Sequence, residues 1–305
     1  MRALLACNPA ARGGRGARAL PAVRDRLGQA GVEVEVHRTS SLADARKTAC
    51  DAAGMVDAVV AMGGDGMVGA CAAGLADAGP DVRAALGVVP AGGGNDVARA
   101  LGLPVDDPLA AAGLLPELAR RRVDLARADS RRFLNVAGAG FDAEVNRLAN
   151  ERLRRAPATL RYVGALVAKL AVERPSRFTL TLDGRAEELA AWLVVVANGR
   201  SYGGGMRVAP DARFDDGVLD VVVIGDLSKA SFLATFPKVY SGRHVEHPLV
   251  AVHHASRVEL AADRPRTVYA DGEHAGELPM VFEVEPSAVT VLATRDAPGL
   301  ASTPP

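Results

Sequence analysis

The stretch DAVVAMGGDG, residues 57–66, gives the clearest indication of the fold, because an apolar run ends there in a turn with three glycines and one aspartate. Such a run predicts a buried strand over 57–62, followed by a helix. Glycine lets a ligand approach backbone N–H groups, and a helix that starts after the turn adds partial positive charge. Taken alone, the turn at Gly63, Gly64 and Gly66 therefore either closes a tight connection between strand and helix or binds a phosphate group.

Similar units surround this stretch in the first 125 residues. We expect further strands at 2–7, 32–37 and 85–90, and helices near 16–30, 41–54, 67–79 and 95–102. Strands that alternate with helices predict a parallel sheet covered on both faces. Ligands of such sheets bind at the carboxyl ends of the strands. We therefore expect three turns to face one cleft: Asn8-Pro9, Gly63–Gly66 and Ala91–Asp96.

The pattern changes after about residue 123 to short strand-like runs separated by Gly, Pro and Asp turns. We expect strands at 132–137, 177–182, 190–197, 218–224, 256–261, 266–270, 280–285 and 288–293, and helices near 142–172 and 228–241. The predicted fold class is an α/β domain with a parallel sheet (1–123) plus a β-rich antiparallel sandwich-like domain (124–294), with a cleft between them. The last strand is free to return to the first domain, and 295–305 is expected to be a loose tail.

Composition restricts the classes of function. The 305 residues hold 36 Lys+Arg and 36 Asp+Glu, a formal net charge of zero, which argues against a nucleic-acid partner. The apolar runs are too short for a membrane-spanning helix, and the N-terminus lacks the features of a secretory signal. Three cysteines without C-x-x-C spacing argue against a disulfide framework and a zinc site, and fit the cytoplasm.

Two glycine turns at neighbouring strand ends, each with an aspartate, strengthen the prediction of a phosphate site. The chain has four lysines, none of them in a Gly-Lys-Ser/Thr context, so a Walker A loop is excluded. Residues 14–19 match G-x-G-x-x-A, but residues 8–13 separate them from the strand, which disfavours an NAD-binding Rossmann unit. Asp65 is placed to take Mg²⁺ or polar groups of a nucleotide.

Three stretches of the second half have a structural and a functional interpretation each. Asp215-Asp216-Gly217 is either a turn or a metal loop with carboxylate and carbonyl oxygens. Asp271-Gly272-Glu273-His274 indicates a hairpin turn, or a loop in which Glu273 is a general base. Residues 144–177 carry eight basic and three acidic side chains. They form either a solvated amphipathic helix that packs on its own domain or a segment that lies on an anionic membrane surface.

Five motifs in a fixed order resemble those of a known family. These motifs are Asn8-Pro9, Gly63–Gly66, Gly92-x-x-Asn95-Asp96 with Arg99, Asp215-Asp216-Gly217 and Asp271-Gly272-Glu273. Together they look like the soluble bacterial diacylglycerol kinase and sphingosine kinase family of lipid kinases, over about residues 2–294. The resemblance implies ATP-dependent transfer of the γ-phosphoryl group to a lipid hydroxyl, with a diacylglycerol-like acceptor favoured. A kinase for a soluble acceptor such as NAD, and an inactive nucleotide- or lipid-binding protein, remain alternatives.

The resemblance also implies roles for single residues. Glu273 would accept the proton of the acceptor hydroxyl, with Asp65 as a second catalytic residue. The nucleotide would be bound by Asn8, Pro9, Arg12, Thr39, Gly63, Gly64, Asp65, Gly66, Met67, Gly92, Gly93, Asn95 and Asp96. A structural Mg²⁺ would be held by Asp216 with the carbonyl oxygens of Arg213 and Val218.

The sequence departs from the family at three hydroxyl positions, which here carry Ala11, Met67 and Gly93. Backbone N–H groups and Arg12 would take over their contacts with phosphate. The expected cofactors are therefore ATP and Mg²⁺, and the expected partner is a lipid with a free hydroxyl. A peripheral contact with the inner face of the membrane and a homodimer are left open.

Overall fold

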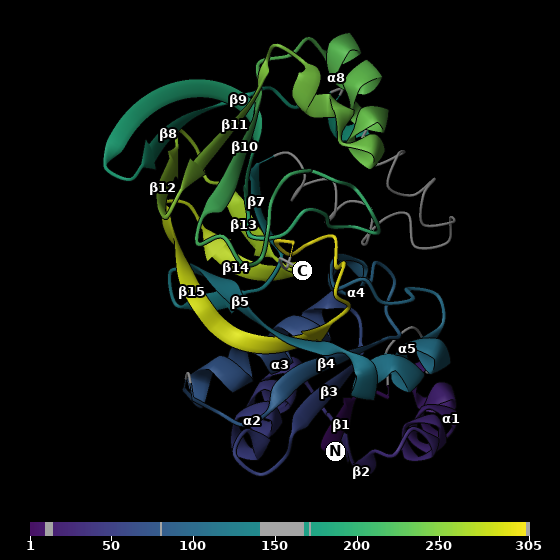
Figure 1. The fold of residues 1–305 in the computed structure, drawn as a ribbon. Coiled ribbons are helices and arrows are strands. Elements are labelled where there is room, and N and C mark those ends of the chain that lie inside the picture. The colour runs from purple at the N-terminus through teal and green to yellow at the C-terminus, as the bar shows by residue number, and fades with distance from the viewer. Residues whose placement is uncertain (10–14, 80, 141–167, 171, 303–305) are drawn as a thin grey trace.

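The computed structural model describes residues 1–9, 15–79, 81–140, 168–170 and 172–302, and Figure 1 shows an α/β half joined to a β-rich half. The N-terminal half contains β1 (Arg2–Cys7), α1 (Arg15–Gln29), β2 (Glu33–Arg38), α2 (Leu42–Ala52), β3 (Ala58–Gly63), α3 (Asp65–Asp77), β4 (Ala85–Pro90), α4 (Asp96–Ala100), α5 (Pro108–Leu114) and the 3-10 helix η2 (Leu115–Glu117). Its strands lie in the order β2-β1-β3-β4 and are parallel, as predicted.

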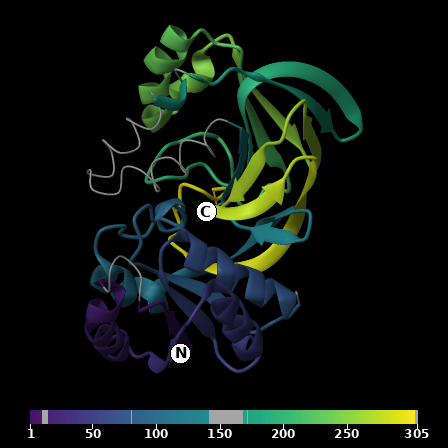
Figure 2. The ribbon, with the colours of Figure 1, turned by 180° about the vertical axis from the view of Figure 1, so that it is seen from behind.

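The central strands of this sheet are apolar because helices cover both faces. On β1, Leu4 and Ala6 pack into the core formed with α2 and α3, whereas Leu5 and Cys7 pack into the core formed with α1. Figure 2 shows the side of the sheet on which α2 and α3 lie. Burial on both faces explains why these strands are continuous apolar runs without alternation.

The C-terminal half is built mostly from antiparallel strands. It contains β5 (Ala119–Ala128), β6 (Arg131–Phe133), β7 (Val136–Gly140), β8 (Ser176–Leu182), β9 (Arg185–Ala197), β10 (Leu219–Gly225), α8 (Lys229–Thr235), the 3-10 helices η3 (Phe236–Ser241) and η4 (Arg243–Glu246), β11 (Val250–Ala255), β12 (Arg257–Ala262), β13 (Thr267–Ala270), β14 (Glu273–Glu277) and β15 (Met280–Ala293). Val194 and Val196 of β9 face the sandwich-like core, whereas Trp192 and Val195 face a second core covered by α8 and η3.

A long ribbon of β5 and β15 joins the two halves. The two strands pair along most of their length, and β15 also pairs with β12 and, through Val291, with Leu86 of β4. The last strand thus returns to the N-terminal sheet, and the runs predicted at 280–285 and 288–293 are one strand with an irregular register between Glu285 and Val289. Residue 123 lies inside β5, so a strand rather than a linker crosses that position.

The second half differs from the prediction in several elements. The strand expected at 132–137 is divided into β6 and β7, because the N–H groups of Leu134 and Asn135 bind the carboxylate of Asp271 instead. The helix expected at 228–241 changes to 3-10 geometry at Phe236, since Pro237 cannot donate a helical hydrogen bond. The exposed strand β11, the short strand β14, the strand β5 and the helix α5 were not predicted.

The helix expected at 142–172, with most of the basic stretch 144–177, lies outside the described residues; of its range, residues 168–170 and 172 are described, and they are helical. The three cysteines are free thiols, as the sequence predicts. In the described ranges, no helix is both long and apolar enough to cross a membrane.

The expectation of a loose tail from residue 295 is wrong as far as Ala301. The Gly299 N–H donates to Ala100 O at 2.8 Å, and the Ala301 N–H donates to the Asp215 carboxylate at 2.7 Å. The side chains of Ala297 and Leu300 are buried in the N-terminal core. Small apolar residues with backbone partners therefore hold this segment, although its composition is typical of a tail.

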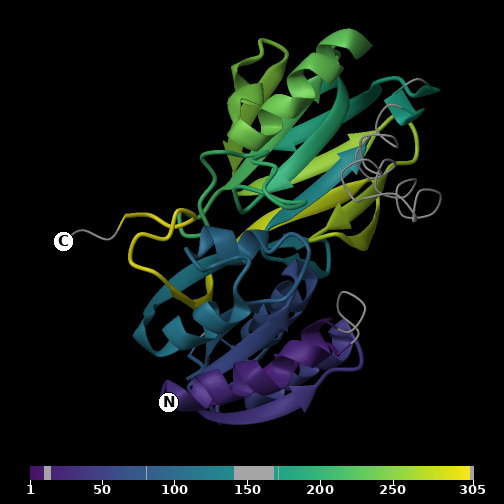
Figure 3. The same cartoon turned by 90° about the vertical axis from the view of Figure 1, so that its right-hand side faces the viewer.

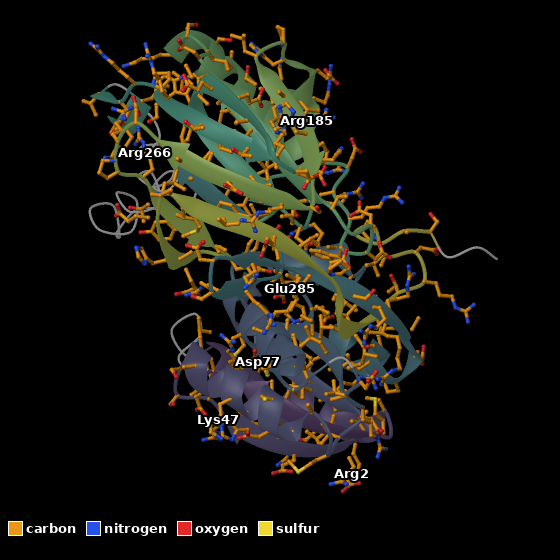
Figure 4. The ribbon with its side chains drawn as sticks, turned by 90° about the vertical axis from the view of Figure 1, so that its left-hand side faces the viewer. Arg2, Lys47, Asp77, Arg185, Arg266 and Glu285 are labelled. Carbon is orange, nitrogen blue, oxygen red and sulfur yellow. The ribbon has the colours of Figure 1, made fainter. Side chains whose placement is uncertain are left out.

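Charged side chains form a chain across the junction of the halves. Asp77 of α3 is paired with Arg46 at 2.6 Å and with Arg132, which also bonds Glu285 of β15. Figure 4 shows Asp77 on the N-terminal half and Glu285 above it on the ribbon. Partly exposed pairs contribute little individually, but a connected set restricts how the halves sit against one another.

Close packing of α2 on α3 gives a test of the fold. A methyl group on Gly74 would lie 2.1 Å from Arg46 O, whereas one on Gly54 would meet nothing within 4 Å. We expect Gly74→Ala to lower the melting temperature by about 3 to 10 °C through overpacking, despite the higher helix propensity of alanine. Gly54→Ala is the matched control and should melt within about 1 °C of the wild type in a calorimetric scan. Equal melting of the two variants would contradict this packing.

Candidate functional site

Two glycine turns touch where β3 and β4 end. A methyl group on Gly92 would lie 2.2 Å from Gly64 Cα, so the two backbones leave no room for a side chain. The Ala91 N–H donates to Gly63 O at 2.9 Å, which fixes the turns side by side. The structure therefore brings together the predicted turns after the third and fourth strands, each followed by a helix N-terminus.

The side chain of Asn95 shapes the second turn. Its Oδ1 accepts the Gly92 N–H at 2.9 Å, and its Nδ2 donates to Val105 O at 2.9 Å. Asn95 also has a positive φ of 54°, in the left-handed region that Asn tolerates better than most residues. Because both polar groups of the amide have partners, Asn95 is a residue that holds the turn, and its contact with a nucleotide stays a prediction.

Asp65 belongs to the first glycine turn and is the first residue of α3, and its side chain reaches toward the second turn. Its Oδ1 accepts the Val97 N–H at 2.9 Å, across to the start of α4. Burial and the negative charges of Asp96 and Asp271 raise the pKa of Asp65 to about 6, although hydrogen bonds from Val97 and Asp96 N–H groups oppose the rise. Excess negative charge at a phosphate site needs a cation, which fits the prediction that Asp65 serves a magnesium nucleotide.

Asp96 connects the two halves of the protein. Its buried carboxylate receives Arg99 Nη1 at 2.8 Å and Ser201 Oγ at 3.2 Å, together with the N–H groups of Gly204 and Gly205, both at 2.7 Å. The last three donors belong to the loop after β9. The sequence offers only the glycine run 203–205 as a signal for this contact, and no role was predicted for Ser201.

The predicted hairpin at residues 271–274 is confirmed. Asp271 and Gly272 have φ angles of 50° and 81°, and β13 and β14 pair around them, as in a two-residue Asp-Gly turn with positive φ at both positions. The Asp271 carboxylate accepts the N–H groups of Leu134 at 2.8 Å, Asn135 at 2.9 Å and Val136 at 3.1 Å. Burial raises the pKa of Asp271, although these three bonds oppose the rise.

This hairpin brings Glu273 to the first glycine turn. Glu273 is the exposed first residue of β14, and a methyl group on Gly66 would lie 3.7 Å from its Oε1. Behind it, a methyl group on Gly69 of α3 would lie only 2.8 Å from Asp271 Oδ2, so glycine permits the close approach. With the described residues, the Glu273 carboxylate forms no hydrogen bond or ion pair, and it is therefore available to a ligand at the turn.

Thr39 and Met67, both predicted to bind nucleotide, have buried side chains in contact with each other. Thr39 Oγ1 lies 3.3 Å from Cys7 O and 3.9 Å from Met67 Sδ. Met67 thus belongs to the protein core, and any contact that it makes with phosphate is left to its backbone. Asn8 and Pro9 are partly buried after β1, Gly93 is exposed, and Arg12 lies outside the described residues.

The predicted metal loop contains Asp216, whose carboxylate accepts the Val218 N–H at 3.2 Å. Burial, with the negative charges of Asp124 and Asp215, raises the pKa of Asp216. Asp124 was not predicted: it lies on β5 and accepts the N–H groups of Gly217 at 2.8 Å and Ser287 at 2.6 Å. A polar residue inside a strand gave no local signal of this role.

The chemistry of this loop fits Mg²⁺. Asp215 is neutralised by Arg121 at 3.0 Å, but Asp216 and Asp124 remain close carboxylates in a partly buried place. In the ranges that the structure describes, no three His, Cys, Asp or Glu side chains are grouped as metal ligands. The predicted set of one carboxylate with the carbonyl oxygens of Arg213 and Val218 offers the hard oxygen ligands that Mg²⁺ prefers.

Comparisons with known proteins agree with this geometry. The diacylglycerol kinase catalytic domain model matches residues 2–128, and the YegS C-terminal NAD kinase beta sandwich-like domain model matches residues 135–293. A diacylglycerol kinase of Mycobacterium tuberculosis is 38% identical over 296 residues, which cover 94% of each chain. The chain belongs to the diacylglycerol kinase family of lipid kinases.

Solved structures confirm the fold of this lipid kinase. A Bacillus anthracis protein described as a candidate diacylglycerol kinase is 28% identical, with a TM-score of 0.82 over 97% of this chain and 96% of that one. An NAD kinase of Archaeoglobus fulgidus in complex with ATP is 14% identical, with a TM-score of 0.53 over 97% and 95%, and this likeness concerns the fold alone. The catalytic domain of the family implies the use of ATP.

The raised pKa of Asp65 predicts that its ionised carboxylate destabilises the folded lipid kinase at neutral pH. Folding shifts the pKa of Asp65 from about 3.9 to about 6, so the contribution of this carboxyl group to stability is fully present below about pH 4 and is lost as the pH rises through 6. Asp65→Asn keeps the acceptor for Val97 N–H without the charge. We expect the ligand-free variant to be more stable than the wild type at pH 7.5 by up to about 3 kcal/mol, and by about a third of that at pH 4.5.

Melting temperatures of the wild type and of Asp65→Asn at pH 7.5 and pH 4.5 measure this difference in stability. The pair at pH 4.5, where the expected difference is smaller, is the internal control. A variant that is less stable than the wild type at pH 7.5 would contradict the assignment of uncompensated charge to Asp65.

Proposed function

We propose that this protein transfers the γ-phosphoryl group of ATP to the hydroxyl of a diacylglycerol-like lipid. The observation that carries the proposal is the Glu273 carboxylate beside Gly66, within reach of a turn that offers backbone N–H groups at the start of α3. Phosphoryl transfer depends mainly on positioning and charge neutralisation, so these groups suffice without a covalent nucleophile.

In this proposal, Gly64, Asp65 and Gly66 hold the phosphates with their backbone N–H groups. Glu273 accepts the proton of the lipid hydroxyl. The oxygen of that hydroxyl then bonds to the γ-phosphorus, and the bond from this phosphorus to the bridging oxygen of ADP breaks. A bound Mg²⁺ would neutralise the phosphate oxygens, with Asp65 beside it; a second, structural Mg²⁺ would be held by Asp216 with Arg213 O and Val218 O. Asp271 acts as a positioning residue, because it fixes the hairpin of Glu273 to β7.

Met67 stands where the family commonly has a hydroxyl side chain that would contact phosphate. Its presence leaves the backbone N–H groups of the turn, which are the proposed phosphate donors, in place. The Met67 side chain is buried beside Thr39, so it leaves the backbone of the turn unobstructed. The unobstructed backbone of the turn favours an active kinase over an inactive nucleotide-binding protein. A diacylglycerol-like acceptor is preferred to NAD because the relatives named as diacylglycerol kinases match nearly the whole chain.

The test is transfer of radiolabelled phosphate from γ-labelled ATP to dispersed diacylglycerol. We expect Glu273→Gln to lower kcat by about 10² to 10⁴, the usual contribution of a general base. Glu277→Gln is the matched control, since Glu277 lies on the same strand and bonds only the Thr267 hydroxyl among the described residues, so its kcat should match the wild type within about twofold.

Full activity of Glu273→Gln would refute the proposed base. Formation of NADP without labelled lipid would favour the soluble-acceptor kinase. ATP binding by calorimetry without turnover on any acceptor would favour an inactive binding protein.

A further inference from the structure

The segment formed by α8 and η3 has apolar residues on two opposite sides. Phe232, Thr235 and Val239, spaced i, i+3 and i+7, are buried, with Phe232 and Val239 packed against the sheet. The opposite side also follows helical spacing, and it is exposed. We call this side the α8 outer face; its residues are Ala230, Leu233, Ala234, Pro237 and Tyr240.

Exposure of this face is considerable. Leu233 is 40% exposed and Tyr240 is 51% exposed. A surface helix ordinarily presents charged and polar residues to water, and a helix that is apolar all round is ordinarily buried. Val172, at the end of the preceding helical stretch, is 77% exposed as well. An apolar surface of this kind indicates a contact that the isolated chain does not make.

The charged residues directly on the α8 outer face are basic. Lys229 and Lys238 flank it, both exposed, and residues 227–245 contain no Asp or Glu, whereas Asp226 and Glu246 lie just beyond that range and Glu246 pairs with Arg243. Lysines beside exposed Leu and Tyr match the interface of an anionic bilayer, where ammonium groups contact lipid phosphates and Tyr lies at the level of the headgroups. A second copy of the chain would instead bring the same lysines together around a two-fold axis.

The α8 outer face is also connected to the functional site. The Arg207 N–H donates to Val239 O at 2.9 Å, and Gly204 and Gly205 of the same loop bind Asp96. Figures 1 and 3 show α8 at the end of the β-rich half, away from α1 and α2. A contact at this face would therefore be made by the half that carries Glu273, without covering the N-terminal sheet.

We propose that the α8 outer face docks on an anionic lipid bilayer, with Leu233 and Tyr240 entering the interface and Lys229 and Lys238 contacting headgroup phosphates. The inference rests on the proposed function, because a lipid acceptor is presented in a bilayer. Docking does not depend on catalysis, so the two can be tested apart.

The test is sedimentation of the full chain with vesicles of phosphatidylcholine alone or with added phosphatidylglycerol, without ATP. We expect the wild type to bind the anionic vesicles more strongly, and the double variant Leu233→Glu/Tyr240→Glu to bind them at least about tenfold more weakly. Lys238→Gln should weaken binding by about fivefold. Met55→Glu is the matched control, because Met55 is 61% exposed on the N-terminal half, and it should bind as the wild type does.

Melting temperatures check that each variant folds. No preference of the wild type for anionic vesicles, or equal binding by the double variant, would overturn the proposal. A double variant that loses self-association in analytical ultracentrifugation but keeps vesicle binding would also overturn it, and would assign the face to a dimer. Vesicle binding that depends on this face, without phosphorylation of any lipid, would support docking and refute the kinase assignment instead.

Discussion

The buried carboxylate of Asp96 is the contact on which the arrangement of the site depends. It receives Arg99 from its own helix and three donors, from Ser201, Gly204 and Gly205, from the other half of the protein. Hydrogen bonds to an ionised group are stronger than neutral ones, and the loss of the carboxylate would leave the Gly204 and Gly205 N–H groups without this partner. The second glycine turn and the loop after β9 are thereby held as one unit.

Asp271 supplies a second connection of the same kind. It accepts three successive backbone N–H groups at the start of β7 and packs on Gly69 of α3, and this fixes the hairpin that carries Glu273. With Asp65 and Asp96 nearby, the carboxylates of three aspartates lie around the turns at which we propose that phosphate binds. The raised pKa of Asp65 predicts that this negative charge lowers the stability of the ligand-free protein, and a magnesium nucleotide would supply the missing positive charge.

The N-terminal half could be predicted closely from the sequence, since strands buried on both faces are continuous apolar runs and the turns are marked by glycine. The strands at 2–7 and 85–90 were predicted at their observed bounds. Motif order placed Glu273 and the glycine turns in one site, although they are about 180 to 210 residues apart. The partners of Asp96 and the role of Asp124 could not be predicted, because these contacts join distant residues with no local pattern. Exposed strands such as β11 were missed because they lack a buried run.

The most direct test of the account is a crystal structure with a non-hydrolysable ATP analogue and Mg²⁺. The account predicts that the γ-phosphate lies against the N–H groups of Gly64 to Gly66, with the Glu273 carboxylate facing it from the hairpin and the Asp96 contacts intact. A nucleotide bound away from these turns, or a γ-phosphate on the side opposite Glu273, would contradict it.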